Sequence, residues 1–157
     1  MSIADDQEKI KQAAYAEARR YMSNAEAVLE KTARDGKFYA DAKYVRMASG
    51  TAYLAVLLAF DAYLQLKGVA LPKKKRLSID FYQNYLGKLN GKLLDLLNNA
   101  YDTLHLAGYY DGNKSAKVIR DGFDTAYEII DTIKPQTELP PDALKSSWWE
   151  KLRLLLA

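Results

Sequence analysis

The chain has 157 residues, no cysteine, one histidine and a net charge of +3. Its length is that of one domain, and it is sufficient to bury a core of its own. The missing cysteines exclude disulfides, thiolate metal sites and cysteine nucleophiles.

The polar N-terminal sequence MSIADDQEKIKQ has no apolar stretch that would indicate a secretory signal. The longest stretch without a charge, residues 47–60, is shorter than the roughly 18 residues expected of a membrane span. We therefore predict a cytoplasmic protein with no membrane-spanning segment.

Two long helices are predicted in the first half of the chain. The first runs from about Asp5 to Arg34 with apolar residues at three- and four-residue steps, and Gly36 is expected to form its left-handed cap. The second runs from about Ala40 to Lys67 and is apolar nearly all round, so it should be the central, buried helix.

The second predicted helix has two unusual features. Its small residues, Ala48 to Ala52, disfavour an isolated helix, and they predict that another helix crosses closely there. Asp61 is a carboxylate among apolar neighbours, and a buried carboxylate needs a partner. We interpret Asp61 as one half of a structural salt bridge, with a functional acid as the alternative.

Two more helices are predicted in the second half of the chain. The third begins after Ser78, which is a good N-cap, and the pair Asn90 and Gly91 should kink or split it. The fourth runs from Ala116 to about Lys134, directly before a proline.

The predicted fold class is all-α. Residues 1–134 should form an antiparallel four-helix bundle, because no segment alternates with period two and no hairpin signal lies between β-rich runs. Residues 135–157 add a proline-rich connector and a short amphipathic helix that packs on the bundle or on a second subunit. The interface candidates in this helix are Trp148, Trp149, Leu152 and Leu155. Its mixed charge argues against a membrane surface.

Most catalytic and metal-binding signatures are missing from the sequence. There is no glycine-rich phosphate loop after a strand, and no serine on a strand-to-helix elbow. With one histidine and no Glu-x-x-His pattern, a di-iron carboxylate site lacks its ligands. Asp102, one turn before His105, is the only close carboxylate, and such a pair is too small a ligand set for a metal. We therefore predict no metal and no cofactor.

Four segments carry a family resemblance: YAEARRYMSNAEAVLEKT, DAKYVRMASGTAYLAVLLAFDAYLQLKG, LLDLLNNAYDTLHLAGYYDG and SAKVIRDGFDTAYEIIDTIK. In order, length and texture they resemble the helices of the HEPN superfamily, small helical domains found beside nucleotidyltransferases and in toxin–antitoxin pairs. The resemblance covers about residues 10–134 and implies a HEPN-like bundle.

The resemblance also implies a test for ribonuclease activity. HEPN members that cut RNA carry an arginine, then four to six residues, then a histidine, and they use no metal. Counting back from the histidine, the matching positions are Ala100, Asn99 and Asn98, and none is a cation. In relatives that are not nucleases an arginine and a later tyrosine end this helix. On that alignment His105 replaces the arginine and Tyr110 matches the tyrosine.

Cations elsewhere in the chain leave two ways to contact nucleic acid. A cation beside His105 would have to come from another helix or a second subunit, and Arg46 and Arg120 are the candidates. The basic loop between the second and third helices is a candidate nucleic-acid site: Lys73, Lys74, Lys75 and Arg76. Four charges alone are more typical of a solvated loop, which we favour.

The function predicted from the sequence is a non-catalytic helical binding module that forms a homodimer. The missing arginine and the apolar C-terminal segment both support it. Its partner would be a protein or, less expected, a nucleotide or RNA. The alternative is a degenerate HEPN-type ribonuclease or nucleotide-binding domain in which His105 acts with Asn98 or Asn99, with Asp102 nearby.

Overall fold

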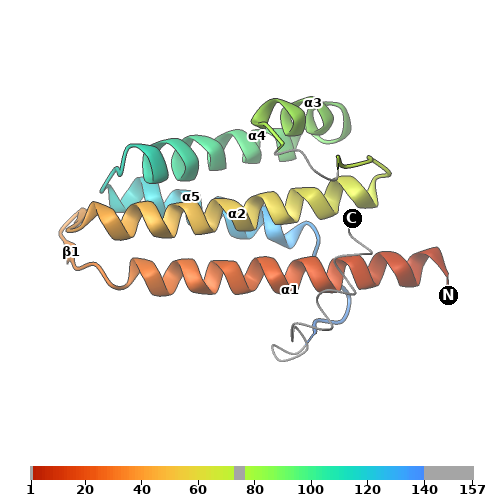
Figure 1. The fold of residues 1–157 in the computed structure, drawn as a ribbon, viewed down its shortest axis with the longest axis horizontal. Coiled ribbons are helices and arrows are strands. Elements are labelled where there is room, and N and C mark those ends of the chain that lie inside the picture. Colours follow the sequence, from red (N-terminus) through yellow and green to blue (C-terminus); the bar gives the residue numbers. More distant parts are fainter. Residues whose placement is uncertain (1, 73–76, 140–157) are drawn as a thin grey trace.

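A computed structural model shows the chain as a set of long helices, and it describes residues 2–72 and 77–139. The elements in chain order are α1 (Ile3–Leu29), β1 (Arg34–Asp35), β2 (Phe38–Tyr39), α2 (Ala42–Leu66), α3 (Ile79–Leu89), α4 (Gly91–Ala100), the π-helix η1 (Tyr101–Tyr110) and α5 (Ala116–Asp131). Figure 1 shows α1 and α2 side by side along most of the molecule. The described residues are mostly helical, which confirms the predicted all-α class.

The first helix begins with a reciprocal cap. The Ser2 hydroxyl accepts a hydrogen bond from the Asp5 N–H, and the Asp5 carboxylate accepts one from the Ser2 N–H. α1 ends at Leu29, earlier than predicted, because the chain then turns into a short hairpin.

The hairpin of β1 and β2 is absent from the sequence prediction. Its strands have two residues each, too few for the alternation that identifies a strand. Gly36 has a φ of 61°, so it takes the left-handed conformation in the hairpin turn and does not cap α1. An isolated bridge between Phe38 and Ser115 connects the hairpin to the start of α5.

α2 is the central helix, and it packs against α1, α5 and η1. By length and composition alone it would be able to cross a membrane, but more than half of its most apolar window is buried inside the protein, as in a core helix. The predicted close crossing is confirmed, and the crossing element is η1. A Cβ added to Gly108 would lie 2.1 Å from the Ser49 Oγ, and one added to Gly50 would lie 3.1 Å from the Tyr109 ring.

The predicted break in the third helix is a complete division into α3 and α4. Asn90 has an extended backbone, and its side chain accepts a hydrogen bond from the Leu93 N–H at 3.2 Å. α4 then continues directly into η1, whose ten residues form a π-helix that the sequence prediction lacks. Gly112, with a φ of 61°, follows the end of η1.

The last described helix, α5, begins at the predicted cap. The Ser115 hydroxyl accepts a hydrogen bond from the Val118 N–H at 3.4 Å, and the helix ends at Asp131. Buried side chains from α1, α2, α4, η1 and α5 meet in one core. The largest of them include Phe60, Phe123, Met22, Leu97, Leu104 and Ile130. The predicted C-terminal helix lies outside the described residues.

Candidate functional site

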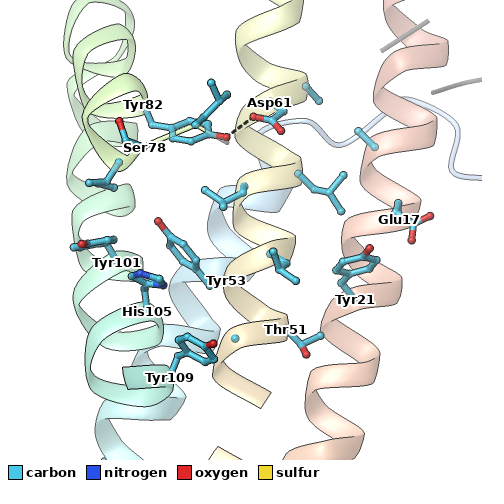
Figure 2. A pocket seen from close by; sticks show the side chains of 18 of the residues that line it. Glu17, Tyr21, Thr51, Tyr53, Asp61, Ser78, Tyr82, Tyr101, His105 and Tyr109 are labelled. Atoms are coloured by element: carbon cyan, nitrogen blue, oxygen red, sulfur yellow. Dashed lines mark hydrogen bonds between the residues drawn. The ribbon is translucent and has the colours of Figure 1, made fainter. Parts of the chain in front are cut away.

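An open groove of about 1220 Å³ lies over the outer face of α2. Side chains of α1 line one side of it, and side chains of η1 and of the start of α3 line the other. Figure 2 shows this arrangement, with Tyr21 on α1 facing α2 and with Tyr101, His105 and Tyr109 on η1. The groove therefore brings together residues from four helices, α1, α2, α3 and η1.

The floor of the groove is one stripe of α2. Its residues recur at three- and four-residue steps, which places them on a single helix face: Met47, Gly50, Thr51, Leu54, Leu57, Leu58, Asp61 and Gln65. Met47 is 50% exposed and Leu54 is 53% exposed, which is unusual for large apolar side chains on a central helix. We refer to these eight residues as the outer stripe.

Five aromatic rings form one wall of the groove, and His105 lies at their centre. Its ring centroid is 4.8 Å from that of Tyr53, 5.1 Å from Tyr101 and 5.1 Å from Tyr110. The Tyr109 ring stacks at 6.0 Å. Residues four apart lie on nearly the same side of the η1 helix, so the turn geometry stacks Tyr101, His105 and Tyr109 in one column.

A cation lies in the same groove as His105, and it is bonded to other groups. Arg46 lines the same groove, and its guanidinium donates hydrogen bonds to the backbone carbonyls of Tyr109, at 3.0 Å, and of Tyr110. These carbonyls belong to the last turn of η1, where carbonyl groups lack helical partners, so Arg46 acts as a cap. Arg120 is elsewhere: it pairs with Glu26 on α1 and packs over the Phe123 ring.

The residues proposed to act in a degenerate nuclease are not gathered in one place, and the Asn98 amide oxygen accepts from the Gln83 amide on α3 at 2.8 Å. Asn99 faces α5, where its amide oxygen accepts from the Thr125 hydroxyl at 2.8 Å and its amide nitrogen donates to Asp121 at 3.3 Å. Asp102 is exposed, and it is not among the residues that line the groove. Of the candidates, His105 alone lies in the groove.

Asp61 lies at the other end of the groove, and its partner differs from the predicted one. The Tyr82 hydroxyl donates a hydrogen bond to the Asp61 Oδ1 at 2.6 Å, as Figure 2 shows. No salt bridge to Asp61 forms within residues 2–72 and 77–139. Burial raises the pKa of the Asp61 carboxyl, and the hydrogen bond from Tyr82 opposes this shift. Burial and the nearby carboxylate raise the pKa of Tyr82.

Two groups of predicted site residues lie outside the described residues. They are the basic loop, Lys73 to Arg76, and the C-terminal segment with Trp148, Trp149, Leu152 and Leu155. In the part of the chain that is described, no three histidine, aspartate or glutamate side chains gather as metal ligands do.

The outer stripe was not predicted from the sequence, and Arg46 and Asp61 were predicted with other partners than the structure gives them. The apolar periodicity of α2 predicted burial on all sides, so it gave no sign that one face stays open. Arg46 was considered as a partner for His105 and not as a cap. Small residues at Ser49, Gly50 and Gly108 were the available signal for where η1 approaches α2.

Over residues 13–135 the chain matches a family described as a domain of unknown function, DUF5618, and it belongs to that family. It is also similar to a solved structure, a protein of unknown function from Dyadobacter fermentans, with 37% sequence identity. The likeness covers 78% of this chain and 94% of that chain, with a TM-score of 0.69. No curated protein matches the chain. The groove lies wholly inside the matched residues, whereas the segment after residue 139 lies beyond them.

Proposed function

We propose that the protein is a non-catalytic helical binding module whose groove over α2 receives an amphipathic helix of a protein partner. The observation that carries this proposal is the outer stripe, in which Met47 and Leu54 are about half exposed inside an open groove. Contiguous apolar surface rimmed by polar groups is typical of interaction sites. The HEPN-like four-helix arrangement that the sequence resembles is part of the same proposal.

The dimensions and lining of the groove suit a helix. From Met47 to Gln65 the outer stripe is about 27 Å long at 1.5 Å per residue, which is the length of four to five helical turns. Recognition of an amphipathic helix in such a groove needs apolar anchors at helical spacing. The tyrosines of the η1 wall offer rings for packing and hydroxyls for the polar rim.

The contacts around His105 support a binding role over catalysis. Its ring is packed among four tyrosine rings, which is the arrangement of an apolar wall. The Arg46 guanidinium in the same groove already bonds to two backbone carbonyls, and these compete with any phosphate. Asn99 bonds to α5 and faces away.

A second copy of the chain is the simplest protein partner, and it would give the homodimer predicted from the sequence. Light scattering over a range of protein concentrations tests this. We expect the mass to rise to that of a dimer, and we expect Leu54→Asp to keep the protein monomeric. Leu89→Asp is the matched control, because Leu89 is 43% exposed and does not line the groove. A mass equal to that of one chain at every concentration would exclude the homodimer.

One observation favours the ribonuclease alternative: Arg46 and His105 line the same groove. A histidine that moves a proton and an arginine that stabilises phosphate charge are the elements of metal-free RNA cleavage. Incubation with total RNA tests it, with His105→Ala and Arg46→Ala beside the unmodified chain. We expect no cleavage by any of the three. Cleavage by the unmodified chain that both substitutions abolish would show that the protein is a ribonuclease and would contradict the non-catalytic binding module.

A further inference from the structure

The described chain ends on the side of α1 that faces away from the groove. The Thr137 N–H donates to the Glu8 carboxylate at 3.2 Å, and the Thr137 carbonyl accepts from the Gln12 amide at 2.9 Å. At about 100° per residue, Glu8 and Gln12 lie on a face of α1 roughly opposite to the groove-lining Ala14 and Glu17. The chain therefore leaves the described structure away from its own groove.

The sequence that follows begins with two prolines. Pro140 and Pro141 come directly after the last described residue, and consecutive prolines hold a chain extended. Because the described chain ends on the far side of α1, we expect this proline sequence to oppose a tight reversal onto α2 of the same chain. The same geometry favours exchange of a terminal segment between two identical copies.

The remaining segment matches the groove in length and in apolar pattern. Residues 142–156 would extend about 22 Å as a helix, within the 27 Å of the outer stripe. Four of its large apolar residues recur at helical spacing, namely Leu144, Trp148, Leu152 and Leu155, and the others are Trp149, Leu154 and Leu156. Leu54, Leu57 and Leu58 lie in the middle of the stripe that they would cover.

Charge in the groove gives the segment a second point of recognition. Glu17 pairs with Arg20, and Arg46 bonds to backbone carbonyls, so both are already engaged. Asp61 is the carboxylate in the groove that has a hydroxyl partner and no salt bridge within the described residues. The segment carries three cations that suit it: Lys145, Lys151 and Arg153.

We propose that residues 142–157 of a second copy fill the groove over α2, with their apolar side chains on the outer stripe and one of their cations at Asp61. Reciprocal exchange makes the dimer symmetric, because each copy gives one segment and receives one. This inference rests on the proposed function and names the occupant of the same groove.

Tryptophan fluorescence of the full chain tests the proposal, because both tryptophans of the protein lie in this segment. Emission and light scattering are measured on the same samples across a dilution series. We expect blue-shifted emission while the protein is a dimer, and a red shift as dilution lowers the mass to that of a monomer. Leu54→Asp should give red-shifted emission at every concentration, and Leu89→Asp should behave like the unmodified chain.

A second variant tests the contact at Asp61. Asp61→Asn keeps an oxygen that accepts from Tyr82 but removes the charge, so the fold is preserved. We expect it to weaken the dimer roughly two- to fivefold for each Asp61 contact, the size of effect that a partly exposed charge pair gives. We expect added salt to weaken the unmodified dimer and to have less effect on the variant. Equal affinity and equal salt dependence would overturn the role of Asp61.

Three other results would overturn the proposal. If the dimer dissociates without a change in emission, the homodimer stands but the C-terminal segment is not part of its interface. Blue-shifted emission from a monomer at every dilution, lost in Leu54→Asp, would place the segment in the groove of its own chain. Red-shifted emission from a permanent monomer would remove both the segment contact and the homodimer.

Discussion

The two faces of α2 are both apolar, yet they differ in what covers them. The inner face carries Ala48, Ala52 and Val56, which are fully buried, whereas the outer face carries Met47 and Leu54, which are about half exposed. Small residues allow neighbouring helices to approach closely. Long, flexible apolar side chains suit a surface that adapts to a partner. Apolar periodicity alone therefore does not separate a core face from a binding face.

The largest difference between the faces should appear in stability. Phe60 is fully buried, so Phe60→Ala should lower the free energy of unfolding by about 3–5 kcal/mol through lost contacts and a cavity. Leu54→Ala on the outer stripe should change the stability of the monomer by less than about 0.5 kcal/mol. Urea denaturation at low protein concentration measures both. Similar losses would contradict the assignment of an inner and an outer face.

The crossing of α2 and η1 should be the next most sensitive feature. Gly108→Ala places a Cβ against Ser49 on a neighbouring helix, and overpacking of this kind costs about 1–3 kcal/mol. Gly91→Ala is the matched control, since a Cβ there meets nothing within 4 Å. It should be neutral or slightly stabilising. Thermal unfolding of the two variants compares them, and equal melting temperatures would refute the close crossing.

A smaller effect is expected where Arg46 caps η1. Arg46→Ala removes two hydrogen bonds to carbonyls of the last turn, and the exposed position limits the loss to about 1 kcal/mol. Hydrogen exchange should show faster opening of residues 106–110 and little change in α1. Unchanged exchange at the end of η1 would mean that Arg46 is not a cap.

The smallest effect is a pH dependence at Asp61. Burial raises the pKa of this carboxyl above its value in the unfolded chain, so the folded state binds the proton more tightly. Stability from this group is therefore fully present below the unfolded pKa and is lost as the pH rises through the folded pKa. At pH 7, Asp61→Asn should be at least as stable as the unmodified monomer, and the difference should disappear toward pH 4. Denaturation at both pH values measures it, and a variant that loses stability at pH 7 would contradict it.

Much of the helical framework was predictable from local sequence. The cap at Ser115, the break at Asn90 and Gly91, and the small residues near Gly50 each act over a few residues, so local pattern predicted them correctly. The hairpin at Gly36 was missed because two-residue strands leave no periodicity. The π-helix was missed because its wider turns depend on packing against α2 and α5, and not on a local signature.

The candidate site was predicted less well, because it depends on contacts between distant segments. The sequence singled out His105 as the one histidine, near the end of the third predicted helix. It did not predict the four tyrosine rings around it, one of which comes from α2. Asp61 and Tyr82 lie on two helices that a loop connects, and no rule of residue spacing predicts that their side chains meet. The open outer stripe is visible only when the neighbours of α2 are known.

The labelling rate of a single thiol on the outer stripe tests the central claim most directly. The chain has no cysteine, so Leu54→Cys and, as the control, Leu89→Cys each introduce a unique thiol of similar exposure. We predict that at high protein concentration Leu54→Cys reacts at least about tenfold more slowly than Leu89→Cys, and that dilution brings the two rates together. Equal rates at every concentration would contradict the account, because the groove would then be empty.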